Sequence, residues 1–132
     1  MRNPIALWAA FLAILVVGGK ARSETVKSIY DGDTFTLTSG EKVRLACVDT
    51  PEMRNTAKKK ADKPAAQAAR AYLVGLINGQ DLTIDRVTKD LYGRTVARVY
   101  TPSGQDVSRE MYLSGHAILF KGYTTPCPWA QQ

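Results

Sequence analysis

Apolar and polar positions alternate in the first part of the chain with the two-residue period of a β-strand. Residues 26–30 are rich in strand-forming side chains, and an Asp-Gly turn signal follows them. Residues 34–38 alternate threonine with phenylalanine and leucine, which is typical of a half-buried strand. Residues 42–48 form a third such stretch, and its parity places Cys47 on the apolar, core-facing side. Residues 25–48 therefore predict a three-stranded antiparallel meander.

The pattern changes to a helical period after residue 63. Pro64 suits the first position of a helix, residues 65–77 are rich in alanine, and an Asn-Gly pair ends the stretch. The apolar face of this helix consists of four residues at helical spacing, namely Ala69, Tyr72, Leu73 and Leu76. The polar residues 55–63 before it predict a solvated loop.

Two further strands and a second helix follow. Residues 82–87 and 95–100 predict the fourth and fifth strands, and residues 106–113 predict a helix that is capped by Asp106 and ends near Gly115. Five short strands with a helix between the third and fourth fit an α+β fold, a five-stranded OB-type β-barrel with two to three helices. The pattern alone leaves other closures of a small mixed sheet open.

The chain divides into three parts. Residues 1–21 have the layout of a secretory signal peptide, with a charged start, an apolar stretch and small residues before a cleavage site after Ala21. As a helix, the apolar residues 5–17 span roughly 20 Å, which is short of the roughly 30 Å of a bilayer core. We therefore expect cleavage and a periplasmic or secreted protein, with a retained membrane anchor as the alternative. Residues 25–120 form one domain, and residues 121–132, with two prolines, predict an irregular tail.

Composition narrows the possible chemistry. Apolar residues make up 45% of the chain and charged residues 23%, which is the balance of a globular domain. The 18 lysines and arginines outnumber the 12 acidic residues, and the net charge of +6 favours polyanionic partners such as nucleic acid or an anionic membrane. One histidine and two cysteines exclude a site of several histidines and a cysteine-rich zinc site.

Four carboxylates lie at two predicted strand ends. Asp31 and Asp33 flank the first turn, and Asp49 and Glu52 follow the third strand. Adjacent antiparallel strands bring these two corners together, and converging carboxylates repel one another unless a hard divalent cation lies between them. Oxygen ligands favour Ca²⁺ or Mg²⁺ over zinc. Ordinary polar turns are the alternative interpretation.

Two arginines accompany the carboxylates. Arg44 lies among apolar neighbours on the third strand, where its guanidinium needs either a carboxylate partner or a phosphate. Arg94 follows Tyr92-Gly93 at the start of the fifth strand, and the glycine permits close backbone approach. Carboxylates for a cation together with two arginines for a phosphate form a coherent phosphodiesterase set.

These segments resemble the staphylococcal-nuclease-like (thermonuclease) domain family, which consists of OB-fold nucleases that depend on Ca²⁺. The resemblance covers residues 25–120, and it is carried by three segments in matching order: Asp31-Gly32-Asp33-Thr34, residues 44–52 and Tyr92-Gly93-Arg94. It implies that the carboxylates of Asp33 and Asp49 and the backbone carbonyl of Thr50 bind Ca²⁺. Asp31 would be an acidic residue in the outer shell of the metal.

The resemblance also implies the roles of the remaining site residues. Glu52 would act as the general base or orient the attacking water, and Arg44 and Arg94 would hold the scissile phosphate. Tyr92 would line the nucleotide pocket. Tyr123 is a second candidate for substrate binding, with packing at the barrel mouth as the alternative. The family cuts DNA and RNA and leaves 3′-phosphate ends.

The lysine run and the two cysteines each allow two interpretations. Lys58-Lys59-Lys60 is either a solvated loop or a patch that attracts the phosphate backbone. Cys47 and Cys127 form a disulfide only if the fold brings the two sulfurs within reach.

The leading hypothesis is an exported, monomeric Ca²⁺-dependent nuclease for DNA and RNA, without a stable protein partner. The alternative is a non-catalytic OB-fold module that binds single-stranded nucleic acid.

Overall fold

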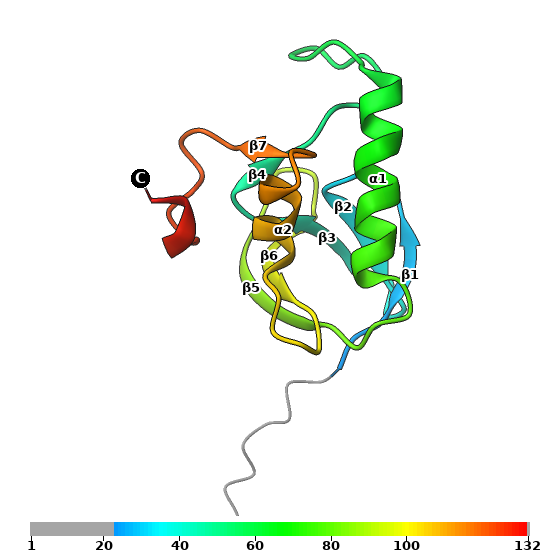
Figure 1. Ribbon diagram of the computed structural model, residues 1–132, viewed down its shortest axis with the longest axis vertical. Coiled ribbons are helices and arrows are strands. Elements are labelled where there is room, and N and C mark those ends of the chain that lie inside the picture. The colour runs from blue at the N-terminus through cyan, green and yellow to red at the C-terminus, as the bar shows by residue number, and fades with distance from the viewer. Residues whose placement is uncertain (1–22, 132) are drawn as a thin grey trace, which may run out of the picture.

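A five-stranded sheet and two helices make up the computed structural model, which describes residues 23–131 (Figure 1). The elements in chain order are β1 (Val26–Ile29), β2 (Thr34–Leu37), β3 (Lys42–Leu45), β4 (Val48–Asp49), α1 (Lys63–Ile77), β5 (Thr83–Lys89), β6 (Thr95–Tyr100), α2 (Val107–Leu113), β7 (Ile118–Leu119) and a 3₁₀ turn at Pro128–Ala130. The predicted signal peptide, residues 1–21, lies outside the described residues. Within residues 23–131, no helix has the length and apolar character needed to span a bilayer.

The main sheet has the strand order β1-β2-β3-β6-β5. The pairs β1–β2 and β2–β3 are antiparallel, as in the predicted meander. Strands β5 and β6 are also antiparallel, whereas β3 and β6 are parallel. Strands β4 and β7 form a separate two-stranded sheet. The sheet and both helices place the fold in the expected α+β class.

The five-stranded sheet is not closed, so the OB-type barrel predicted from the sequence is not confirmed. Its edge strands β1 and β5 meet only at the bridge between Glu24 and Leu82, which exchange two backbone hydrogen bonds of 3.1 and 2.9 Å. The bridge is antiparallel and lies where both strands begin. The two strands therefore run away from it in opposite directions, and the ladder cannot extend.

The stretch predicted as one strand, residues 42–48, is divided in two. Cys47 has a φ of 73°, which is a left-handed conformation. It interrupts the extended chain between the end of β3 and the start of β4. The prediction that Cys47 continues the apolar face of β3 is therefore wrong. Cys47 is buried in a second, smaller cluster with Ala46, Cys127 and Ala130.

Helix α1 begins close to the predicted position. Asp62 caps it by accepting a hydrogen bond from the Ala65 N–H at 3.3 Å, and a proline occupies its first turn. The buried face consists of Ala66, Ala69, Leu73 and Ile77, and it packs into the core. Tyr72 is exposed and Leu76 is only partly buried, so the predicted apolar face was rotated relative to the observed one.

A glycine lets α1 approach the turn between β1 and β2. A Cβ atom at Gly32 would lie 2.7 Å from the Cβ of Ala69 and 3.0 Å from Cγ2 of Thr50. Both atoms belong to tightly packed side chains, because Ala69 and Thr50 are fully or almost fully buried. The turn that carries Asp31 and Asp33 is thus pressed against the helix at a position where only glycine fits.

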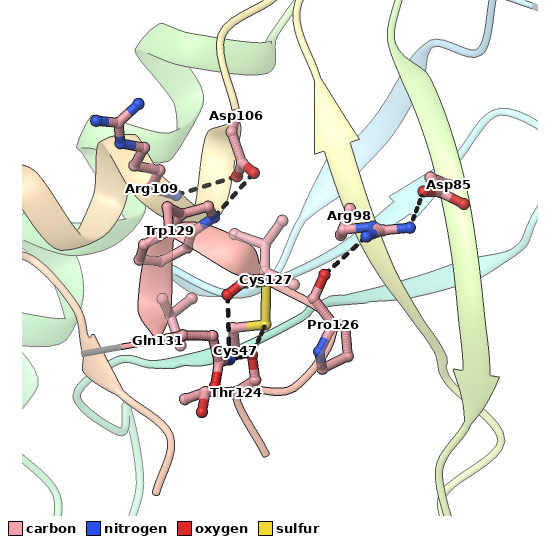
Figure 2. Close-up of a disulfide and its surroundings, with 12 residues drawn as sticks. Cys47, Asp85, Arg98, Asp106, Arg109, Thr124, Pro126, Cys127, Trp129 and Gln131 are labelled. Atoms are coloured by element: carbon pink, nitrogen blue, oxygen red, sulfur yellow. Dashed lines mark hydrogen bonds and ion pairs between the residues drawn. A yellow bond between two sulfur atoms is a disulfide. The ribbon is translucent and has the colours of Figure 1, made fainter.

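The C-terminal segment is mostly irregular, as expected, but it is anchored to the domain at several points. A disulfide joins Cys127 to Cys47, Arg98 donates to the Pro126 carbonyl at 2.7 Å, and the Trp129 indole N–H donates to Asp106 at 3.0 Å (Figure 2). Asp106 also caps α2, as predicted, by accepting from the Arg109 N–H at 3.1 Å.

We expect the disulfide to contribute substantially to stability, because it closes a loop with a sequence separation of 80. In the chain-entropy model, a cross-link of this length stabilises the fold by roughly 4–5 kcal/mol. Cys127→Ala should therefore lower the free energy of unfolding measured by urea titration. The double variant Cys47→Gly/Cys127→Ala should recover about 1 kcal/mol, because glycine adopts the positive φ of position 47 without strain. Equal urea midpoints for the oxidised and reduced wild-type protein would contradict this expectation.

Candidate active site

The acidic and basic residues singled out in the sequence come together where β2, β3 and β4 approach one another. Asp33 directly precedes β2, Arg44 lies on β3 and Asp49 ends β4. The antiparallel register places Thr34 opposite Arg44, so Asp33 lies beside the guanidinium. The Nη2 atom of Arg44 is 3.4 Å from Oδ2 of Asp33 and 3.5 Å from Oδ1 of Asp49.

The Asp33 carboxylate is held from several sides. Asp33 is buried, with 4% of its surface exposed. Its Oδ1 accepts a hydrogen bond from the Thr34 hydroxyl at 2.9 Å. Oδ2 accepts from the backbone N–H of Thr50 at 3.1 Å. Through this last bond, Asp33 positions the segment that carries the Thr50 carbonyl.

The Arg44 guanidinium is fixed by backbone carbonyls. Arg44 is 8% exposed, and its Nη1 donates to the carbonyls of Leu45 at 2.6 Å and Val48 at 2.7 Å. The left-handed turn at Cys47 lies between Arg44 and Val48 and lets the Val48 carbonyl face the Arg44 side chain on β3. One nitrogen therefore anchors the side chain, and the other faces the two carboxylates.

A third cation, Lys59, enters the site from the loop between β4 and α1. Its ammonium lies 2.8 Å from Oδ2 of Asp49 and 2.9 Å from the carbonyl oxygen of Thr50. The lysine run was interpreted as either a solvated loop or a patch that attracts phosphates, and neither interpretation included this contact. The position of Lys59 depends on how the loop folds back, which no local pattern reports.

The predicted metal ligands fit a hard cation. The two carboxylates and one carbonyl are oxygen donors of the kind that Ca²⁺ prefers, and water can complete its coordination. The Lys59 ammonium is itself a positive group on which oxygens of Asp49 and Thr50 converge. Across residues 23–131, no cluster of three or more His, Cys, Asp or Glu side chains is arranged to hold a metal ion. Any cation here would thus rely on the backbone carbonyl and water.

Two further carboxylates carry raised pKa values. Burial, followed by the charge of Asp33, raises the pKa of Asp31 from 3.8 to about 7. Burial and then the charge of Asp33 also raise the pKa of Glu52, although Lys59 and Arg44 oppose the shift. Burial is thus the main cost of ionising both carboxyls, the charge of Asp33 adds to it, and a cation bound nearby would favour their ionised forms.

Arg94 and Tyr92 lie at the edge of this cluster. Nε of Arg94 pairs with Asp90 at 2.7 Å, and its Nη1 donates to the Thr34 hydroxyl at 3.3 Å. Thr34 in turn donates to Asp33, so Arg94 is linked to the acidic cluster through one hydroxyl. The Tyr92 ring is 82% exposed, and the Arg94 guanidinium lies over it at 5.4 Å from the centroid.

Tyr123 forms part of an aromatic pair next to Arg44. Its ring is 65% exposed and stacks on Phe120, with centroids 4.7 Å apart. The Arg44 guanidinium lies 5.5 Å from the Phe120 centroid. Phe120 was not among the predicted site residues. It directly follows β7, and its N–H donates to the Cys47 carbonyl at 2.8 Å. The sequence signal that could have indicated Phe120 is its spacing of three residues from Tyr123, directly after the apolar pair Ile118-Leu119.

Comparison with known proteins points to one family. The sequence model of the family described as staphylococcal nuclease homologue matches residues 42–131. The chain is 30% identical over 103 residues to an "Uncharacterized endonuclease" of Escherichia coli O157:H7, covering 76% of this chain and 62% of that protein. It is 34% identical over 102 residues to "Endonuclease YhcR" of Bacillus subtilis (strain 168), covering 70% of this chain and 8% of that protein. It is 36% identical over 83 residues to "Probable endonuclease LCL3" of Candida tropicalis, covering 61% of this chain and 34% of that protein. The chain thus spans less than two thirds of the length of these relatives.

The raised pKa of Asp31 predicts a pH-dependent effect of Asp31→Asn in metal-free protein. Below about pH 4 the carboxyl is protonated in both the folded and the unfolded state. Between about pH 4 and pH 7 it ionises only in the unfolded state, so stability falls as the pH rises, and the full loss is present above pH 7. The asparagine cannot ionise, and its carbonyl can still accept from the Asp33 N–H, as Oδ1 of Asp31 does at 3.0 Å.

We therefore expect Asp31→Asn to raise the free energy of unfolding by about 1–3 kcal/mol at pH 8 and by little at pH 4. Chemical denaturation in the presence of a chelator measures both values. Asp81→Asn, at an exposed residue, is the control for the general effect of removing one negative charge. A stabilisation by Asp31→Asn that is equal at both pH values would rule out the assigned cause.

Proposed function

This chain belongs to the staphylococcal nuclease homologue family, and we propose that it is an exported Ca²⁺-dependent nuclease. It hydrolyses phosphodiester bonds of DNA and RNA with little sequence preference and leaves 3′-phosphate ends. The observation that carries this proposal is the fixed Arg44 guanidinium, which faces two carboxylates and also lies near the Phe120 ring. Export to the periplasm or medium and a monomeric state are part of the proposal, and export rests on residues 1–21.

Charge neutralisation is the main requirement of the reaction. A phosphodiester is already anionic, and further negative charge develops on its oxygens as the attacking oxygen approaches. Arg44 would bind the scissile phosphate through the face that now lies near Asp33 and Asp49. Arg94 would reach the same phosphate from the edge of the cluster, and its bond to Asp90 keeps its side chain oriented.

Asp33, Asp49 and the Thr50 carbonyl would hold Ca²⁺, which supplies further positive charge opposite the phosphate when it is bound. The hydrogen bond from the Thr50 N–H to Asp33 couples two of these ligands, so they are oriented together. Gly32 and the helix behind it limit how far the acidic turn can move.

Glu52 would take the proton from the attacking water. A base with a raised pKa holds an abstracted proton more firmly than an ordinary glutamate does, and burial is the first cause of this raised pKa. The same residue is half-buried, so water can reach it. Its environment therefore makes Glu52 a stronger proton acceptor than an exposed glutamate.

The decisive measurement is the cleavage of heat-denatured DNA with millimolar Ca²⁺ and with a chelator. We expect cleavage with Ca²⁺ only, and we expect Glu52→Gln to lower kcat by about 10²–10⁴-fold, the range for loss of a general base. Glu110→Gln removes the same type of charge from a residue on α2 that has no assigned role, and it should retain activity. A folded, oxidised protein that binds single-stranded DNA but does not cleave it would instead support the non-catalytic binding module.

Removing the exposed ring of the aromatic pair should weaken the binding of single-stranded DNA. Stacking of a base on an aromatic side chain contributes about 1–3 kcal/mol, so Tyr123→Ala should raise KM for denatured DNA by about 5- to 150-fold, with a smaller effect on kcat. Tyr123→Phe retains the ring and should stay within about threefold of wild type. Tyr72→Ala, at an exposed tyrosine on α1, is the control. An unchanged KM in Tyr123→Ala would assign this ring to packing.

A further inference from the structure

The loop between β4 and α1 reaches back to the site through a single lysine. Figure 1 shows this loop projecting past the start of α1. Lys58 and Lys60 on either side are exposed, whereas Lys59 is half-buried and its ammonium contacts Asp49 and Thr50. The lysine run therefore contains one residue whose environment differs from that of its neighbours.

Hydrogen bonds within the loop set the direction of Lys59. The Thr56 hydroxyl oxygen accepts from the Lys59 N–H at 3.0 Å, and the Thr56 N–H donates to the Lys59 carbonyl at 2.8 Å. The Asn55 side chain accepts from the Ala61 N–H at 2.9 Å. These contacts form a compact turn that holds the lysine side chain toward the site.

The Lys59 ammonium donates hydrogen bonds to the same oxygen atoms that are proposed as metal ligands. Oδ2 of Asp49 and the Thr50 carbonyl oxygen are both proposed Ca²⁺ ligands, and both are within 2.9 Å of the lysine nitrogen. Oδ1 of Asp49 faces Arg44 at 3.5 Å, so this carboxylate lies between two cations of its own chain. Ca²⁺ at its usual 2.3–2.6 Å from these oxygens would overlap with the ammonium and repel it.

We propose that Lys59 is a tethered cation that occupies the Ca²⁺ site in the metal-free protein and that Ca²⁺ has to displace it. The inference rests on the proposed function, because it uses the same ligands. It has two consequences. Lys59 weakens Ca²⁺ binding by competing for Asp49 and Thr50, and Ca²⁺ binding releases the loop with its three lysines. The released lysines can then approach the phosphate backbone of a nucleic acid.

Calorimetric titration of the full chain with Ca²⁺ tests the competition. Lys59→Gln should bind Ca²⁺ about three- to tenfold more tightly than wild type, the range expected for loss of one partly exposed ion pair that the metal must break. Lys58→Gln is the matched control, because it removes the same charge from the adjacent exposed position. Its affinity should stay within about twofold of wild type, which separates displacement from long-range electrostatics.

Chemical labelling tests the displacement without any measurement of activity. Brief acylation of the full chain, followed by peptide mass spectrometry, reports how accessible each ammonium is. Ca²⁺ should raise the labelling of Lys59 by about three- to tenfold and leave Lys58 and Lys60 almost unchanged. Thr56→Ala removes the hydroxyl that orients the turn, and it should raise Lys59 labelling already in the absence of Ca²⁺.

The outcomes separate this inference from the proposed function. Tighter Ca²⁺ binding by Lys59→Gln alone, together with Ca²⁺-dependent labelling of Lys59, supports the tethered cation. Equal Ca²⁺ affinities for wild type, Lys59→Gln and Lys58→Gln would overturn it while leaving a Ca²⁺-dependent nuclease intact. Absence of Ca²⁺ binding in wild type and both variants would overturn the inference together with the proposed Ca²⁺ dependence.

Discussion

One buried guanidinium organises the site. Arg44 is anchored by the carbonyls of Leu45 and Val48, and its remaining nitrogen faces Asp33 and Asp49. A buried charge is costly unless its partners are well placed, and removing one partner leaves the other uncompensated. The position of the Val48 carbonyl, which anchors Arg44, depends on the break between β3 and β4. An interruption of the strand thus supplies the geometry that a continuous strand could not.

The elements that stabilise the fold also hold this geometry. The left-handed turn at Cys47 is tied by the disulfide to the C-terminal segment, and its carbonyl accepts from Phe120. The same segment therefore fixes the aromatic pair and the turn behind Arg44. The close approach of Gly32 to Ala69 seats the acidic turn on α1. Loss of either attachment would loosen the site before it unfolds the domain, because each acts directly on a backbone that carries site residues.

Local signals predicted the elements well, and the errors concern contacts between distant parts of the chain. The fifth strand was predicted with its observed bounds, Thr95–Tyr100, and the cap at Asp106 follows from its position before an apolar period. The parallel pairing of β3 with β6 and the open sheet edge depend on packing that no window of sequence contains. The positive φ of Cys47 is equally hidden, because a cysteine does not signal a left-handed turn. Lys59 and Phe120 reach the site only through the fold of a loop and the tail.

The balance of charge constrains the order in which ligands can enter the site. Burial and the charge of Asp33 leave Asp31 and Glu52 with raised pKa values even with Arg44 and Lys59 in place. An anionic phosphate that approached Arg44 under these conditions would come close to the carboxylates of Asp33 and Asp49, which would repel it. A divalent cation in place of a single ammonium adds one positive charge where the carboxylates converge, and it frees the ammonium for the phosphate backbone. Cation binding would therefore precede or accompany substrate binding, because the acidic cluster repels the substrate until it is neutralised.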